Sequence, residues 1–189
     1  MQIMARLLLC AAVVLGGSGC LFPQDDQVLP TLPPVKNRPP RIVDATPKDQ
    51  PLDFVSGTIP GSGGQPCDGT KFKVTVDDPD LGDKIFSIWF IDKTTDSLPF
   101  RPNPIVANGQ STRTVEQPSA SAFRTSLSSL ATGTHLVTVY VADNDFAEII
   151  DGAVTAQGTL VTLPDGSEVQ DPGYVDSYTW VLRVGPACQ

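Results

Sequence analysis

Glutamate and histidine are scarce in this chain of 189 residues, which leaves little material for long helices. It holds three Glu against 18 Asp, and one His. Glu favours helices, whereas Asp favours turns and loops. The chain also contains 18 Pro and 16 Gly, which interrupt regular structure. These proportions predict an all-β fold whose strands are joined by many turns.

Positive charge is also in short supply. The 13 Lys and Arg residues face 21 Asp and Glu, so the formal net charge is −8. A chain with this balance repels a phosphate backbone, and we expect no nucleic-acid partner. Because 40% of the residues are hydrophobic, a core can form, and the length suits one domain with appendages.

Hydrophobic runs long enough to span a membrane are missing from the N-terminal region. Leu7–Leu15 is apolar over nine residues, and a spanning helix needs about 20. A basic start, a short apolar centre and small residues after it are typical of an export signal. A buried N-terminal helix or strand is the alternative.

The segment Gly17-Ser18-Gly19-Cys20 resembles the lipobox of bacterial lipoproteins, with Gly17 where that family usually has Leu. The resemblance implies that residues 1–19 are a cleaved signal peptide and that Cys20 is acylated, with palmitate among its chains. Two or more acyl chains give stable membrane anchoring. Leu21 stands where an Asp would favour the inner membrane, so the resemblance implies the outer membrane of the cell envelope.

A proline-rich linker follows, over residues 20–40. Leu21–Pro40 has six prolines and neither a helical nor a strand period. We expect a semi-rigid spacer of at most about 60 Å, at about 3.1 Å per residue. Alternatively, the segment packs along the domain as an irregular strand.

The remainder of the chain, residues 41–189, alternates between short apolar stretches and turns. Lys71–Val76 places Phe72, Val74 and Val76 on one face, which is the pattern of a half-buried strand. Ser177–Val184 likewise places Trp180 on an inward face. The five predicted strands are Arg41–Thr46, Lys71–Val76, Ile85–Ile91, His135–Val141 and Ser177–Val184. With no amphipathic helix in view, they favour a sandwich of two sheets.

Three stretches resemble the immunoglobulin-like domains of bacterial surface proteins, close to the PKD and cadherin-like groups. They are Arg38–Ile42, Asp77–Asp83 followed by Ile85 and Trp89, and Leu130–Val137 running on to Asp143. The resemblance implies an immunoglobulin-like β-sandwich with a buried Trp. It says little about function, because this fold hosts many unrelated roles.

Two segments exceed that pattern and are expected as insertions, near 92–121 and 146–174. Within the second, Thr159–Val169 predicts a hairpin around Pro164-Asp165-Gly166. Insertions on a rigid sandwich are where binding specificity tends to lie. They are equally compatible with no role in binding.

Cysteine is rare, with four in the chain. Cys10 leaves with the signal and Cys20 is acylated, so Cys67 and Cys188 remain. An even pair in an exported chain suggests a disulfide, and the immunoglobulin-like resemblance places both at the same end of the sandwich. Two free thiols are the alternative.

Catalytic motifs are missing too. A nucleophile-base system needs a base beside an exposed nucleophile, and His135 has no nucleophile elbow, zinc-binding helix or phosphate-binding loop to accompany it. Gly61–Gly64 indicates a flexible loop. We expect His135 to be a strand-edge residue with a satisfied hydrogen bond, and the protein not to be an enzyme.

Three classes of function remain. The first is a membrane-anchored lipoprotein whose sandwich is an interaction or structural module. The second is a carbohydrate-binding module, which would need exposed aromatic side chains, yet Trp89 and Trp180 are predicted to point inward. The third is an accessory subunit of an envelope complex that recognises protein partners through Phe146–Tyr174.

Acidic residues gather in two loops that the resemblance places at one end of the sandwich. Calcium prefers six to eight oxygen ligands, and Asp side chains on turns supply them. The segment does not fit the EF-hand loop, and an acidic surface without metal is the alternative. The candidate calcium ligands are Asp77, Asp78, Asp80, Asp83, Asp143 and Asp145, with Asn144 as a neutral donor.

Overall fold

The computed structural model of this protein describes residues 37–55, 65–66, 71–94, 98–150, 153–163 and 165–185. Several expectations lie outside these residues: the signal peptide, Cys20, most of the linker, Gly61–Gly64, and both Cys67 and Cys188. In the described part, no helix is long and apolar enough to cross a membrane.

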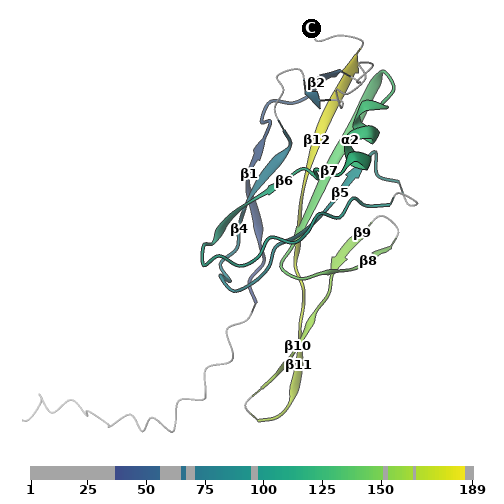
Figure 1. The fold of residues 1–189 in the computed structure, drawn as a ribbon. Helices are drawn as coiled ribbons and strands as arrows, with labels where there is room; N and C mark the ends of the chain where they lie inside the picture. The colour runs from purple at the N-terminus through teal and green to yellow at the C-terminus, as the bar shows by residue number, and fades with distance from the viewer. Residues whose placement is uncertain are drawn as a thin grey trace, which may run out of the picture. The chain divides into compact units, whose positions relative to one another are not determined.

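The described chain is mostly β-strand, as its composition predicts, and is arranged in four sheets (Figure 1). A three-stranded sheet has the order β1-β4-β6, and a five-stranded sheet the order β3-β2-β12-β7-β5. Two further pairs, β8-β9 and β10-β11, form separate hairpins. The strands are β1 Arg41–Thr46, β2 Leu52–Val55, β3 Gln65–Pro66, β4 Lys73–Asp77, β5 Phe86–Ile91, β6 Thr112–Glu116, β7 Gly133–Ala142, β8 Phe146–Ile150, β9 Ala153–Ala156, β10 Thr159–Thr162, β11 Glu168–Asp171 and β12 Val175–Gly185.

One hydrophobic core takes side chains from both larger sheets. Val74 of β4 and Val115 of β6 belong to the same cluster as Val137 of β7 and Leu182 of β12. The alternation of each sequence segment explains this, because every second side chain of a strand points to the same face. The faces predicted for Lys71–Val76 and for Trp180 in Ser177–Val184 are confirmed: Phe72, Val74, Val76 and Trp180 are buried. Leu182 and Val184 of β12 and Val137, Val139 and Val141 of β7 are buried as well.

Two tryptophans lie at the centre of this core. The rings of Trp89 and Trp180 stack with their centroids 5.8 Å apart and their planes 6° from parallel. Phe72 packs on Trp180 at 5.1 Å. Both indoles are fully buried, so neither offers an exposed platform for a sugar.

A short helix, α2 at Ser121–Ser128, was not expected from the sequence. Its residues are mostly polar and it lacks a side-chain N-cap bond, so its local helix signals are weak. Packing explains it: Phe123 and Leu127 are both buried, and Phe123 makes an edge contact with Trp89 at 6.0 Å. Helical spacing of four residues puts these two side chains on one face.

The segment 92–121, expected as an insertion, contributes directly to both sheets. It supplies β6, which pairs with β4. It also lies along the free side of β5, where Phe100 bridges Trp89 and Ile105 bridges Ile85. The edge of the five-stranded sheet is therefore covered there.

The segment 146–174 forms the two hairpins, which we call the arm. The predicted hairpin is confirmed as β10 and β11, and β8 with β9 precedes it. The arm connects β7 to β12, which pair with each other so that Val175 lies opposite Ala142. The first hairpin also packs on the five-stranded sheet, because Phe146 is buried with Ile88 and Phe90 in a second hydrophobic cluster.

Candidate functional site

The acidic site is built on the turn that follows β4. Asp78 is fully buried, and its Oδ1 accepts the backbone N–H of Asp80 at 3.0 Å. The backbone N–H of Asp83 in turn donates to the carbonyl of Asp80 at 3.1 Å. Asp side chains stabilise turns by accepting hydrogen bonds from the backbone N–H two residues further on. The spacing of Asp78 and Asp80 therefore stabilises this turn locally.

Arg113 of β6 closes one side of the site. Its Nη2 donates to Oδ2 of Asp78, and its Nη1 donates to the backbone carbonyl of Asp83. Arg113 is 3% exposed. Removing two charges from water is costly unless they are paired and hydrogen-bonded. The ladder between β4 and β6 provides the pairing, because it sets Val76 opposite Arg113.

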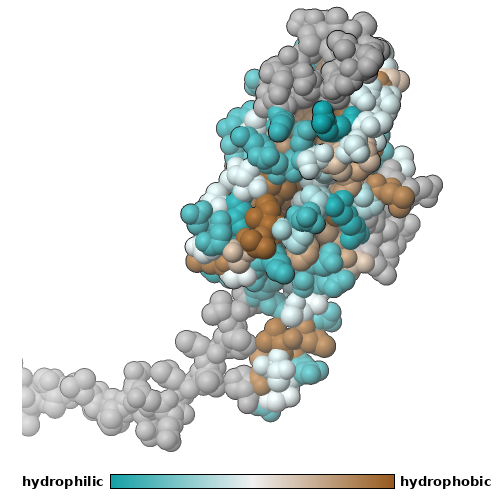
Figure 2. Space-filling view, viewed as in Figure 1, coloured by the Kyte–Doolittle hydropathy of each residue, from teal (hydrophilic) through white to brown (hydrophobic). Residues whose placement is uncertain are grey.

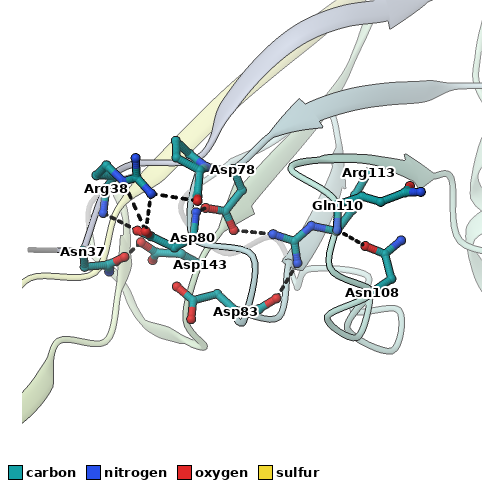
Figure 3. Close-up of polar contacts among 10 residues, drawn as sticks. Asn37, Arg38, Asp78, Asp80, Asp83, Asn108, Gln110, Arg113 and Asp143 are labelled. Atoms are coloured by element: carbon teal, nitrogen blue, oxygen red, sulfur yellow. Dashed lines mark hydrogen bonds and ion pairs between the residues drawn. The ribbon is translucent and has the colours of Figure 1, made fainter. Parts of the chain in front are cut away.

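Arg38 and Asn37 close the other side. The guanidinium of Arg38 donates to Oδ1 of Asp80 at 2.9 Å and to the carbonyl of Pro79 at 2.7 Å. Asn37 Nδ2 donates to Oδ2 of Asp143 at 2.8 Å. Figure 3 shows the carboxylates of Asp78, Asp80, Asp83 and Asp143 lying between Arg38 and Arg113. Asn37 and Arg38, the first two residues that the structure describes, thus both bond to this site.

Two of these carboxylates are shifted towards their neutral form. Burial raises the pKa of Asp83, and the charges of Asp78, Asp80 and Asp143 raise it further, while Arg113 opposes them. Burial also raises the pKa of Asp143, against hydrogen bonds from the backbone N–H of Tyr174 and from Asn37. Crowding of like charges disfavours ionisation in both cases.

Three of the predicted ligands are positioned to share one cation. Carboxylate oxygens of Asp78, Asp80 and Asp83 all lie within 4.8 Å of one another, so this Asp cluster could hold a metal ion. Clusters of this kind are also common without a metal. Their partners, Arg113 and Arg38, already offset part of the negative charge.

The remaining predicted ligands are placed differently. Asp143 joins the site through Asn37, as described above, whereas Asp145 is exposed and accepts the N–H of Phe146 at 2.8 Å. Asn144 uses its amide to hold the arm, donating to the carbonyl of Gln157 at 3.0 Å. Asp77 is the last residue of β4 and lies opposite Arg41 and Thr112 in the ladders. None of the three remaining acidic ligands, Asp77, Asp143 and Asp145, belongs to the compact group.

Sequence reasoning missed the cationic and amide side chains of this site, Arg38, Asn37 and Arg113. Arg38 lies within Arg38–Ile42, one of the three stretches that resemble immunoglobulin-like domains. That resemblance is the one sequence feature that could have pointed to Arg38. Arg113 had no comparable signal, because it is separated from Asp78 by 35 residues. Arg113 lies in the segment 92–121, which was expected as an insertion, so no strand was predicted there.

His135 lies near the beginning of β7 with its hydrogen bonds satisfied, as expected. Nδ1 contacts Oδ2 of Asp92, and Nε2 lies 2.8 Å from the carbonyl of Ala131. Both ring nitrogens thus face acceptors, an arrangement that the doubly protonated ring satisfies. Burial lowers the pKa of His135, but the bonds to Asp92 and Ala131 outweigh it, so the pKa lies above its usual value.

An open groove lies on the arm. Val154, Ala156, Pro172, Tyr174 and Val175 line it, together with Thr155, Gly158, Gln170 and Gly173, and its volume is about 640 Å³. Two chain segments cross tightly beside it: a Cβ on Gly173 would stand 2.3 Å from the carbonyl oxygen of Gln157. Glycine is required there because only it permits so close an approach.

Comparisons of this chain with protein-family models, with curated proteins and with solved structures found no match.

Proposed function

We propose that this protein is a non-enzymatic lipoprotein of the bacterial cell envelope, anchored in the outer membrane through acylated Cys20, and that its domain binds envelope proteins through the arm. The observation that carries the proposal is the arm itself. Neither hairpin forms a ladder with the larger sheets in the described chain. The first hairpin packs on the five-stranded sheet through Phe146, and the second, β10-β11, has no buried residue. Binding residues are typically presented in this way, on a segment held out by a rigid scaffold.

We further propose that the scaffold is an immunoglobulin-like sandwich. Its strand orders support this: β1-β4-β6 matches the A-B-E sheet, and β5-β7-β12 matches the C-F-G sheet. The buried Trp89 on β5 occupies the position of the Trp that such domains carry on strand C. A fold of this kind does not by itself specify a function.

A binding role also agrees with the state of His135. Both of its ring nitrogens are engaged, by Asp92 and by the carbonyl of Ala131. A general base needs a free nitrogen within reach of the proton that it removes. The Asp92–His135 pair instead links the end of β5 to β7.

Crosslinking in intact membranes tests the binding role. Because Val175 lies opposite Ala142, replacing residues 145–173 with an Asn-Gly turn keeps β7 and β12 in register. The deletion also removes Phe146 from Ile88 and Phe90, so Ile88→Thr and Phe90→Thr are added to the shortened chain to keep the uncovered face polar. We expect the full chain to form specific crosslinked products with envelope proteins and the shortened chain to lose them. If a folded, shortened chain forms the same products, the arm is not the binding element.

The anchor is tested separately. The Cys20→Ala chain should leave the detergent phase into which the acylated protein partitions, since acyl chains provide the membrane affinity. Unchanged partitioning would contradict the lipoprotein assignment without bearing on the arm.

We also propose calcium as a ligand of the acidic site, supported by the Asp78, Asp80 and Asp83 oxygens within 4.8 Å of one another. Extracellular calcium sites bind at about 10⁻⁴–10⁻³ M, so thermal melts should compare EDTA with millimolar CaCl₂. A cation that binds only the folded state raises Tm. We expect a calcium-dependent rise that Asp80→Asn abolishes, with millimolar MgCl₂ as a control. Superimposable melts of the unaltered protein would contradict calcium binding.

A further inference from the structure

The hairpin of β10 and β11 is largely exposed to solvent. None of the residues in these two strands is buried, and Leu160 and Val169 are 66% and 49% exposed. Figure 2 shows hydrophobic atoms gathered on the part of the chain where Figure 1 labels β10 and β11. An isolated two-stranded hairpin is marginally stable in water, and a third strand is what stabilises such a ribbon.

Within the part of the chain that the structure describes, the outer edge of β10 has backbone groups without a hydrogen-bond partner. The backbone N–H of Leu163 donates to the carbonyl of Ser167 at 2.7 Å. Hydrogen-bonded pairs recur at every second residue of an antiparallel ladder, so the next such pair is Val161 with Val169. In an antiparallel ladder the intervening residues turn their N–H and C=O groups outward. On β10 these are Leu160 and Thr162.

Nothing in β10 protects this edge. The strand reads Thr-Leu-Val-Thr, with no charge, no proline and no irregularity in its pairing with β11. Three other edges of the described sheets carry devices that prevent strand addition. Phe100 and Ile105 bridge to β5, β1 contains a register shift between Ile42 and Asp44, and β3 has only two residues, one of them Pro66.

The charge of the arm indicates what could pair with this edge. Residues 146–174 contain five acidic residues and no Lys, Arg or His. Asp165 at the tip has a lowered pKa because Ser167 donates hydrogen bonds to it, so it stays ionised. A second copy of the chain would be repelled, because its arm carries the same negative charge. A strand with Lys or Arg side chains would be attracted.

We propose that the outer edge of β10 accepts an extended, basic strand of a partner protein by β-augmentation. This rests on the proposed binding role of the arm and names the partner's chemistry. Main-chain hydrogen bonds to Leu160 and Thr162 hold the added strand, and its Lys or Arg side chains meet the acidic residues of the arm.

Synthetic strands test this on the full chain without a known partner. The probe is a peptide of about eight residues that alternates Val and Lys, a length typical of a strand. The first control alternates Val and Glu. The second keeps the Val-Lys sequence but is N-methylated at alternate residues, in two versions that block one edge or the other. We expect the Val-Lys probe to bind, the Val-Glu probe not to bind, and at least one N-methylated version to bind about tenfold more weakly or less.

Variants of the protein locate the site. Thr162→Pro removes an outward N–H that the hairpin does not use, and proline is tolerated at such edge positions. We expect it to weaken probe binding at least about tenfold, while Thr162→Ala, which keeps the N–H, changes it less than about twofold. Amide exchange at Val161 and Val169 shows whether the hairpin is intact in each variant. In the unaltered protein, bound probe should slow exchange at Leu160 and Thr162.

Several outcomes would overturn the proposal: no binding of the Val-Lys probe, equal binding of the Val-Glu probe, or unchanged binding to a Thr162→Pro chain with an intact hairpin. Dimerisation that Thr162→Pro abolishes would show that a second copy is the occupant instead. If Thr162→Pro keeps the membrane crosslinks that deletion of the arm removes, β-augmentation is wrong while the proposed function stands.

Discussion

Arg113 and Asp78 form an ion pair whose side chains are 1% and 0% exposed. The pair joins β6 to the turn after β4 and fixes one wall of the acidic site. An isolated charge would be strongly disfavoured at this depth, so each residue depends on the other.

Removing one member of the pair should be severely destabilising. We expect Arg113→Met to lower the free energy of unfolding by about 3–5 kcal/mol, because Asp78 is left as an uncompensated buried charge. Urea unfolding measures the change. The control is Arg38→Met, whose side chain is 53% exposed and whose ion pair should contribute less than about 1 kcal/mol. Equal effects of the two substitutions would contradict this account.

The hydrogen bonds of His135 to Asp92 and to the carbonyl of Ala131 should make the free energy of unfolding depend on pH. Its folded-state pKa is raised above the ordinary 6.5, so the added stability is fully present below pH 6.5 and is lost as the pH rises through the folded pKa. His135→Gln should therefore cost most at low pH and progressively less at higher pH. Unfolding measured from about pH 5 to about pH 9 checks this, and a pH-independent difference would count against it.

Gly173 should not tolerate a side chain. A Cβ there would stand 2.3 Å from the carbonyl oxygen of Gln157 and 2.7 Å from the Cβ of Ala156. We expect Gly173→Ala to destabilise the arm by about 1–3 kcal/mol, seen as faster amide exchange in β9 and β10. Gly82→Ala is the matched control, because a Cβ at Gly82 meets nothing within 4 Å. Unchanged exchange in Gly173→Ala would show that the two segments separate easily.

Cys67 and Cys188 are predicted to form a disulfide. Both lie outside the described residues, but β3 ends at Pro66 and β12 ends at Gly185, in one sheet with β2 between them. Mass spectrometry of the unreduced, unfolded protein should find neither of these two thiols free to alkylate. On the chain-entropy model, closing a loop of about 120 residues contributes about 4–5 kcal/mol, so reduction should lower Tm markedly. Two alkylatable thiols would rule the bond out.

The sequence by itself determined which residues face the core in the long strands. Alternation is a local property, since a strand turns every second side chain to one face whatever it pairs with. Phe72, Val74 and Val76, or Trp180 and Leu182, could therefore be placed before any partner strand was known. The hairpin at β10 and β11 followed in the same way from its turn residues, Asp165 and Gly166.

Tertiary structure alone decided α2, β6 and the closure of the acidic site. α2 has weak local signals and is held by the packing of Phe123 on Trp89, which no helix-propensity argument contains. Asp78 pairs with Arg113 across 35 residues, and Asp80 with Arg38 across 42. The sequence showed the concentration of acids but not the arginines that pair with it. Those contacts exist only because the sheet brings distant segments into register, and register is set by the burial of whole strand faces rather than by any short motif.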